Sequence, residues 1–200
     1  MAQSDSKLTL YTNPICPFAH RALLTATEKG LSSRPSSSLL AVNPRGTVPT
    51  LVHGEHTIHE SLLITEYLDD AFFNASPRLL PSDPYQRYAS RFIVDQFGSQ
   101  VIPALYQLLR NQDRSQDDKI KEEITKKLKA LLDLYSAQAG EGPYFLGQHI
   151  SLADVAILPF IGRFAISLPH YRDFDVLAVD ERLKKWHDAF GYAKYANPTQ

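Results

Sequence analysis

The spacing of hydrophobic and polar positions changes along the chain near residue 80. Residues 7–12 alternate polar and apolar side chains, which is the period of a half-buried strand. Residues 17–29 follow a helical pattern, with Pro17 suited to the first turn and Gly30 to the end of a helix. The pattern therefore predicts a strand that leads through a short loop into a helix.

A second strand-rich stretch precedes the next predicted helix. Residues 48–52 and 56–58 are short β-rich runs on either side of Gly54, and a two-residue turn that begins with glycine is a hairpin signal. Helical spacing returns over residues 61–72. Residues 7–75 are thus predicted to form a strand, a helix, a gap, two strands and a helix.

Beyond the first 84 residues the pattern is helical almost throughout. Apolar side chains at helical spacing predict helices over residues 85–110, with a kink at Pro103, and over 120–135 and 181–190. Residues 151–164 form a more apolar stretch that contains Pro159 and predicts a buried helix. Ser151 and Asp154 have the S-x-x-D spacing of a capping box at its start.

The change of pattern predicts two domains of different class. Residues 77–84 (PRLLPSDP) contain three prolines and are typical of a linker. We expect a small α/β or α+β domain over residues 1–76, a linker over 77–84, and an all-α domain over 85–200.

Composition places the chain among ordinary globular proteins. Of its 200 residues, 44% are hydrophobic and 22% are charged, which argues against disordered and fibrous classes. Its 21 Lys and Arg residues against 22 Asp and Glu residues give a net charge of −1. A chain so close to neutral has no general attraction to nucleic acid, so we expect no nucleic-acid partner.

The sequence also predicts a cytoplasmic protein without a membrane span. The first fifteen residues lack the basic segment and apolar core of a signal peptide. The most apolar stretch, residues 155–168, is interrupted by Pro159 and Arg163. Cys16 is the single cysteine, so an intrachain disulfide is impossible and a reducing compartment is expected.

Cys16 is the strongest candidate for chemistry. It lies between the first predicted strand and the first predicted helix, where unpaired N–H groups and the positive end of the helix dipole favour a thiolate. Ala19 stands where a C-x-x-C pair would have its second cysteine, so a second thiol must come from solution. The alternative interpretation is a buried, inert cysteine.

Three histidines near the predicted hairpin raise the question of a metal site. His53, His56 and His59 have neither the H-E-x-x-H spacing nor a thiolate nearby. Solvated turn histidines are the favoured interpretation, and we expect no metal.

Four sequence segments together resemble one known family. They are residues 16–21 (CPFAHR), 43–51 (NPRGTVPTL), 60–68 (ESLLITEYL) and 151–154 (SLAD). The first half resembles a thioredoxin-fold domain, and the whole chain resembles a cytosolic glutathione transferase. The CPFA segment and residues 80–85 (LPSDPY) are similar to the omega, or cysteine-type, class.

The resemblance implies a binding site for glutathione. The backbone at Val48, before a cis-proline, would pair with the cysteinyl part of glutathione. Ser61 would bind the γ-glutamyl carboxylate and Glu60 the ammonium group. The implied set is Cys16 as the catalytic residue, with Phe18, Arg34, Val48, Pro49, Glu60 and Ser61 as the glutathione-binding residues.

One segment departs from the family pattern. Only twelve residues separate Gly30 from Asn43, roughly half the family's number, and Arg34-Pro35 resembles the end of the missing part. Either the segment is a genuine deletion or residues are missing from the sequence. We expect the thioredoxin-like domain to lack its second strand.

The helical half contains candidates for a hydrophobic substrate site, although such side chains are more often core. These candidates are Tyr106, Phe160, Arg163 and Phe164. Tyr11, near the end of the first strand, is a rival to Cys16, because tyrosine-type transferases use a hydroxyl there. Its other interpretation is a packed aromatic side chain.

The sequence therefore predicts an omega-like glutathione transferase that acts as a thioltransferase or reductase through a mixed disulfide at Cys16. Its expected reactions are removal of glutathione from mixed disulfides and reduction of dehydroascorbate or glutathionyl ketones. The alternatives are conjugation or isomerisation of small electrophiles with glutathione, and a non-catalytic ligand-binding member. The resemblance also implies a homodimer.

Overall fold

The structure is a computed structural model that describes residues 8–31, 39–139 and 141–191. The chain divides into two compact units, Met1–Leu80 and Pro81–Gln200. Each unit is described by itself below.

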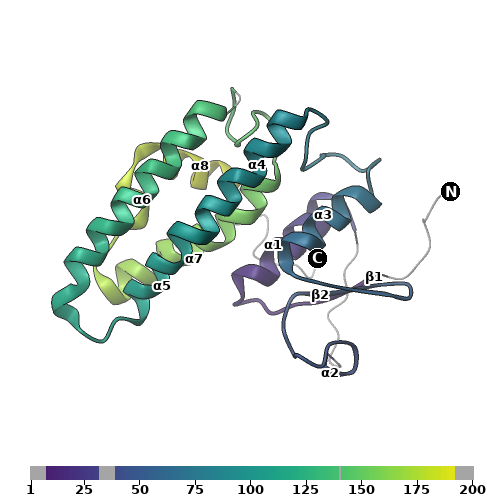
Figure 1. The fold of residues 1–200 in the computed structure, drawn as a ribbon, viewed down its shortest axis with the longest axis horizontal. Coiled ribbons are helices and arrows are strands. Elements are labelled where there is room, and N and C mark those ends of the chain that lie inside the picture. The colour runs from purple at the N-terminus through teal and green to yellow at the C-terminus, as the bar shows by residue number, and fades with distance from the viewer. Residues whose placement is uncertain (1–7, 32–38, 140, 192–200) are drawn as a thin grey trace. The chain divides into compact units, whose positions relative to one another are not determined.

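The first unit is built on a small antiparallel sheet. Its strands β1 (Leu8–Tyr11), β2 (Thr50–His53) and β3 (His56–His59) lie in the order β1-β2-β3 (Figure 1). The β2–β3 hairpin turns at Gly54, whose φ of 61° is a conformation that glycine adopts without steric cost. The predicted first strand and hairpin are therefore confirmed.

Two helices pack on this sheet. Helices α1 (Pro17–Glu28) and α3 (Ser61–Ala71) lie side by side against the strands (Figure 1), where the sequence predicts helices. Burial of apolar side chains drives this packing. The shared core consists of Leu10 and Leu51 from the sheet, Ala22 and Ala26 from α1, and Ile64 and Leu68 from α3.

The described part of the first unit contains no strand between α1 and β2. A short helix, α2 (Leu39–Val42), lies there instead. The unit is thioredoxin-like with a three-stranded sheet, in agreement with the prediction that the second strand is missing. Residues 32–38, and with them the candidate Arg34, lie outside the described residues.

A buried ion pair holds the end of the first unit. Asp69 of α3 lies 2.7 Å from Lys29 Nζ, and both side chains are buried. The carboxylate also accepts hydrogen bonds from the backbone N–H groups of Leu79 and Leu80. Burial opposes its ionisation, but these donors and Lys29 outweigh burial and lower the pKa of Asp69. The chain after α3 is thereby fixed to α1 and α3.

The elements of the second unit are all helices within its described residues, as predicted, and loops join them. Its elements are α4 (Pro84–Gln96), the π-helical segment η1 (Phe97–Val101), α5 (Ile102–Arg110), η2 (Arg114–Gln116), α6 (Asp117–Gln138), α7 (Leu152–Arg172), η3 (Val176–Val179) and α8 (Glu181–Phe190). Figure 1 shows α4, α5, α6 and α7 as a bundle.

The irregularity in the predicted 85–110 helix lies before Pro103 and not at it. Residues 97–101 form a π-helical turn between α4 and α5. Proline has no N–H, so the carbonyl of Ser99, four residues earlier, has no normal helical partner. The π-helical turn, one turn before the proline, accommodates this missing hydrogen bond.

Helix α7 forms the core of the second unit and is longer than predicted. It extends to Arg172 rather than ending at Phe164, because Leu168 in the added turns is fully buried and stabilises them. Among the described residues only α7 has the length and apolar character to cross a membrane, with a mean hydropathy of 1.5. However, 72% of that window is buried inside the protein, as in a core helix.

The predicted S-x-x-D motif begins α7 as a capping box. The Asp154 carboxylate accepts a hydrogen bond from Ser151 N at 2.7 Å, from Phe145 N at 3.0 Å and from Trp186 Nε1 at 2.6 Å. Burial raises the pKa of Asp154, and these donors oppose the shift. Asp154 therefore ties the start of α7 to α8 and to the preceding loop.

Candidate functional site

Cys16 is the N-cap residue of α1 and its side chain is half-buried. Its N–H donates to Asn13 O at 3.1 Å, and its carbonyl accepts from His20 N at 3.0 Å. The loop before it is further held by Ile15 N, which donates to Asn13 Oδ1. The Cys16 side chain makes no capping hydrogen bond to the described first turn. The thiol thus stands at the N-terminus of α1, at the positive end of its helix dipole.

Sheet register brings the other candidates to the same place. Tyr11, at the end of β1, pairs with Thr50, at the start of β2, and Thr50 pairs with His59, at the end of β3. The segments that flank these three residues therefore meet at one edge of the sheet. They carry Cys16, Val48-Pro49 and Glu60-Ser61.

The Val48-Pro49 peptide bond is cis, as the resemblance implies. Val48 is half-buried and Pro49 is buried. Asn43, only 2% exposed, holds the turn before them, because its Nδ2 donates to Thr47 O at 3.0 Å and to Thr50 Oγ1 at 2.9 Å. Asn43 lies in the sequence motif, but its supporting role depends on contacts that the motif does not reveal.

Glu60 and Ser61 form the junction between β3 and α3. Glu60 is exposed and has φ 67° and ψ 121°, a conformation that is uncommon for a residue other than glycine. Its carbonyl accepts from Ile64 N at 2.9 Å, which anchors it to the first turn of α3. Ser61, the first residue of α3, is 7% exposed.

Arg21 is a site residue that sequence reasoning did not assign. It is 4% exposed on α1, and its Nη1 donates to Ser61 Oγ at 3.2 Å. Its guanidinium carbon lies 5.3 Å from the ring centre of Phe18, which is partly exposed. The available signal was weak: an arginine next to Ala22 on the helix face that packs against α3.

Two further candidates in this unit, Tyr11 and His53, are buried. Tyr11 is 7% exposed within β1. His53 corrects the expectation of solvated turn histidines: it is 4% exposed, with Nδ1 2.8 Å from Tyr67 Oη and its ring stacked on Phe72. The reason is the strand register, which points His53 toward α3 rather than toward solvent. The described residues hold no group of three or more His, Cys, Asp and Glu that could bind a metal ion.

The candidates of the second unit differ in exposure. Tyr106 of α5 and Phe164 of α7 meet edge to face, with ring centres 5.1 Å apart. Phe160 has no exposed surface and packs against Phe97, so it belongs to the core of this unit. Arg163 is half-buried, and its Nη1 donates to Pro159 O at 2.8 Å.

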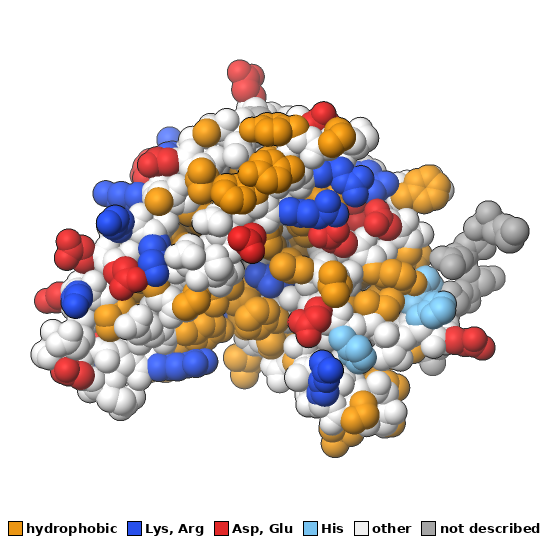
Figure 2. Space-filling model, viewed as in Figure 1, with side chains coloured by type: hydrophobic (Ala, Val, Ile, Leu, Met, Phe, Trp, Pro, Cys, Tyr) orange, Lys and Arg blue, Asp and Glu red, His pale blue; other side chains and the backbone are white. Residues whose placement is uncertain are grey.

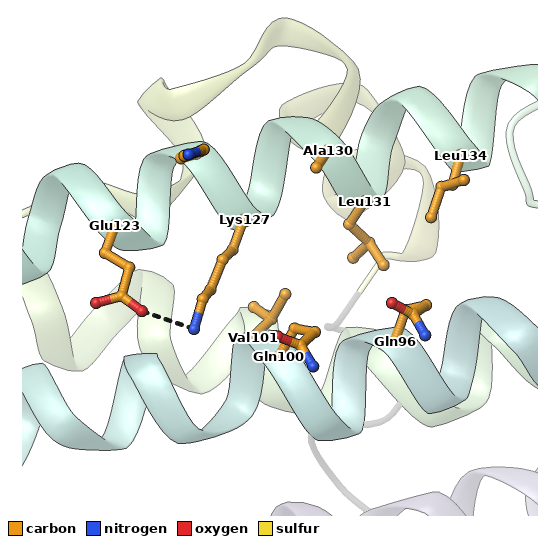
Figure 3. A pocket seen from close by; sticks show the side chains of 9 residues that line it. Gln96, Gln100, Val101, Glu123, Lys127, Ala130, Leu131 and Leu134 are labelled. Atoms are coloured by element: carbon orange, nitrogen blue, oxygen red, sulfur yellow. Dashed lines mark ion pairs between the residues drawn. The ribbon is translucent and has the colours of Figure 1, made fainter.

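The second unit also contains a surface groove of about 410 Å³ between α4–η1 and α6 (Figure 3). Gln96, Gln100 and Val101 line one side, and Leu131 and Leu134 lie opposite them on α6. Its Lys127 is paired with Glu123 at 2.7 Å. We assign no chemistry to this groove.

Comparison with known proteins assigns both halves of the chain to one family. The family described as "Glutathione S-transferase, N-terminal domain" matches residues 15–71, and "Glutathione S-transferase, C-terminal domain" matches residues 88–196. Glutathione S-transferase L3 of Arabidopsis thaliana is 31% identical over 95% of this chain and 82% of that protein.

Solved structures of two classes are similar to this chain. Glutathione transferase Omega 3C from Trametes versicolor aligns with a TM-score of 0.83 at 28% identity, over 100% of this chain and 86% of that one. The Tau class glutathione S-transferase from mango, Mangifera indica, aligns with a TM-score of 0.83 at 27% identity, over 98% and 91% of the two chains.

Proposed function

The chain belongs to the glutathione S-transferase family, whose members use glutathione as co-substrate, and we propose that it is an omega-like, cysteine-type member that acts as a glutathione-dependent thioltransferase. The observation that carries the proposal is the position of Cys16. It is the single thiol of the chain, it caps α1, and it lies at the sheet edge that also carries Val48-Pro49 and Glu60-Ser61.

In the proposed reaction the Cys16 thiolate attacks the glutathione sulfur of a mixed disulfide. The disulfide bond breaks, the substrate sulfur leaves as a thiolate and takes a proton from water, and Cys16 becomes disulfide-bonded to glutathione. The thiolate of a second glutathione then attacks the glutathione sulfur on Cys16. Oxidised glutathione leaves and the Cys16 thiolate is restored, so one mixed disulfide and one glutathione give one free thiol and one oxidised glutathione.

The surroundings of the sheet edge suit this substrate. The N–H and C=O groups of Val48 would pair with the cysteinyl part of glutathione. Ser61, at the start of α3, would bind the γ-glutamyl carboxylate, which the positive end of the helix dipole favours. Glu60 would bind the ammonium group, and the exposed Phe18 would border the site. Arg34 belongs to the same proposal but lies outside the described residues.

We assign the glutathione-binding domain to residues 1–76, the linker to 77–84 and the hydrophobic substrate site to the helical domain over 85–200. The proposed contacts of that substrate site are Tyr106 on α5 and Arg163 and Phe164 on α7, supported by Phe160 from the core. We also propose a cytoplasmic homodimer that binds no nucleic acid.

Conjugation or isomerisation of small electrophiles with glutathione is the second candidate function. The similarity to a Tau class structure favours it as strongly as the similarity to an Omega class structure favours the first. Cysteine is poorly suited to this role, because its thiolate competes with glutathione as a nucleophile for the electrophile. A non-catalytic ligand-binding protein is the third candidate.

Replacement of Cys16 by serine separates these functions. A serine hydroxyl forms no disulfide but can still donate a hydrogen bond to the thiolate of bound glutathione. We expect Cys16→Ser to abolish reduction of a glutathione mixed disulfide, while conjugation of an aryl halide persists or rises. Both rates are measured in steady-state assays, and calorimetry is expected to find glutathione binding retained.

The variant Tyr11→Phe is the matched control, because it removes the rival hydroxyl and leaves the thiol. It should reduce mixed disulfides at the wild-type rate. Full disulfide-reducing activity in Cys16→Ser would overturn the proposal. A wild-type protein that binds glutathione but has neither activity would point to the ligand-binding function.

A further inference from the structure

Arg21 connects the two parts of the proposed glutathione site. It lies on α1, five residues after Cys16, and it reaches across to the first residue of α3. Its Nη1 donates to Ser61 Oγ at 3.2 Å, and both side chains are almost fully buried. A guanidinium in such a place costs desolvation energy and is retained only where its contacts compensate for that cost.

The contact with Arg21 fixes the direction of the Ser61 hydroxyl. A guanidinium has donors only, so the Ser61 oxygen must accept and its hydrogen must point away from Arg21. A hydroxyl with its lone pair engaged in this way can donate to an external acceptor. A carboxylate is the acceptor for which such a donor beside a positive charge is best suited.

Arg21 also interacts electrostatically with the nucleophile. Burial lowers the pKa of Arg21 to about 10, and the negative charge of Cys16 opposes this shift. The side chain therefore stays positive at neutral pH. Its guanidinium also lies over the Phe18 ring, in the first turn after Cys16, with 5.3 Å between the guanidinium carbon and the ring centre. Thus the same cation is coupled to the thiol and to Ser61.

We propose that Arg21 is a positioning residue of the glutathione site, which orients the Ser61 hydroxyl toward the γ-glutamyl carboxylate and supplies positive charge that stabilises the Cys16 thiolate. This inference rests on the proposed function. It adds a buried cation to a site whose other proposed contacts come from the Val48 backbone and Glu60.

The adjacent Thr25–Thr65 contact offers a matched control. Thr25, one turn after Arg21 on α1, is fully buried, and its Oγ1 donates to Thr65 Oγ1 on α3 at 3.2 Å. Thr25→Val removes this contact from the same α1–α3 interface, together with the hydrogen bond from Thr25 Oγ1 to the Arg21 carbonyl at 2.9 Å. It leaves the Arg21 guanidinium and its contact with Ser61 in place. Any effect of interface damage alone should therefore appear in both Arg21→Met and Thr25→Val.

The first test measures charge beside Cys16 with two alkylating reagents of similar size. Iodoacetate is an anion and iodoacetamide is neutral, so the ratio of their rates with Cys16 reports the local charge. We expect Arg21→Met to lower this ratio by about threefold or more. Arg21→Lys keeps the charge and should restore the ratio, and Thr25→Val should leave it at the wild-type value. An unchanged ratio in Arg21→Met would overturn the electrostatic role.

The second test measures glutathione affinity by calorimetry in a double-mutant cycle. We expect Arg21→Met and Ser61→Ala each to weaken binding by about tenfold or more, and the double variant to lose little beyond either single variant. Additive losses would overturn the orientation of Ser61 by Arg21. Thermal unfolding identifies variants that fail to fold, and Arg21→Lys then takes the place of Arg21→Met in the cycle, since lysine cannot reproduce the directed guanidinium contact.

Different results would overturn the proposed function and the proposed role of Arg21. A wild-type protein that binds no glutathione and forms no Cys16–glutathione disulfide by mass spectrometry would overturn both. A wild-type protein that does both, together with Arg21 variants that match it in rate ratio and affinity, would overturn the role of Arg21 alone.

Discussion

Individual buried polar side chains, rather than the nucleophile alone, shape the proposed site. Asn43 provides an example, because its amide bridges Thr47 and Thr50 and so holds the turn that carries Val48. Arg21 provides a second, because it connects α1 to Ser61. Each adds a hydrogen bond between buried side chains, and such a bond contributes about 0.5–1.5 kcal/mol to stability.

Replacement of Asn43 by alanine is expected to loosen the Val48 turn. The Thr47 carbonyl and the Thr50 hydroxyl lose their shared donor, so Asn43→Ala should weaken glutathione binding and lower the free energy of unfolding by about 1–3 kcal/mol. Calorimetry and urea unfolding measure the two effects. Asn111→Ala in the second unit removes a similar amide that donates to Asp117 Oδ1, and it should affect stability only. Equal glutathione affinity in both variants would contradict the role of Asn43.

The sequence singles out the proposed chemical residues of the site more readily than the residues that support them. Cys16 and the Glu60-Ser61 pair stand out because their residue types have a clear purpose at a strand–helix junction. Arg21 and His53 do not stand out, because their burial results from contacts between α1, the sheet and α3. Periodicity within one segment carries no information on which distant segment will cover it.

At the scale of elements, local sequence signals predict some features of the fold, and tertiary contacts determine others. The hairpin at Gly54 and the capping box at Ser151 are short-range features, and both are found where the sequence predicts them. The π-turn at Phe97–Val101 and the extension of α7 to Arg172 are not predicted. Both depend on how neighbouring helices pack against a helix whose hydrogen bonds are interrupted by proline. The spacing of residues along the chain does not specify this packing.

The start of α7 should be sensitive to one atom of Asp154. An amide replaces one of the two acceptor oxygens of Asp154 by a donor. That donor then faces either the N–H of Ser151 or the N–H groups of Phe145 and Trp186. We expect Asp154→Asn to lower the free energy of unfolding by about 3 kcal/mol, measured by urea unfolding. Asp83→Asn at the exposed N-cap of α4 is the matched control and should be nearly neutral, because asparagine also caps helices. A small effect of both variants would contradict this account of the capping box.

At the scale of the whole molecule, the surface of α4 is unusually aromatic for a helix exposed to solvent. Tyr85 and Tyr88 are 65% and 52% exposed. The Tyr88 ring is stacked on Phe92 with 5.6 Å between ring centres, and the Tyr85 ring lies 5.9 Å from that of Tyr88. Figure 2 shows hydrophobic side chains gathered over α4. Such a face favours burial against another surface, which agrees with the proposed homodimer.

A charge placed on this face should separate the two subunits. We expect light scattering to give the wild-type protein twice the chain mass of 22.5 kDa, and Tyr88→Glu to shift the molecule to a single chain at low micromolar concentration, because a buried glutamate without a partner opposes association. Tyr171→Glu is the matched control: Tyr171 is 60% exposed on α7, outside the aromatic face of α4, and its replacement should leave the dimer intact. A wild-type protein of single-chain mass would exclude the homodimer, while a dimer insensitive to Tyr88→Glu would move its interface away from α4.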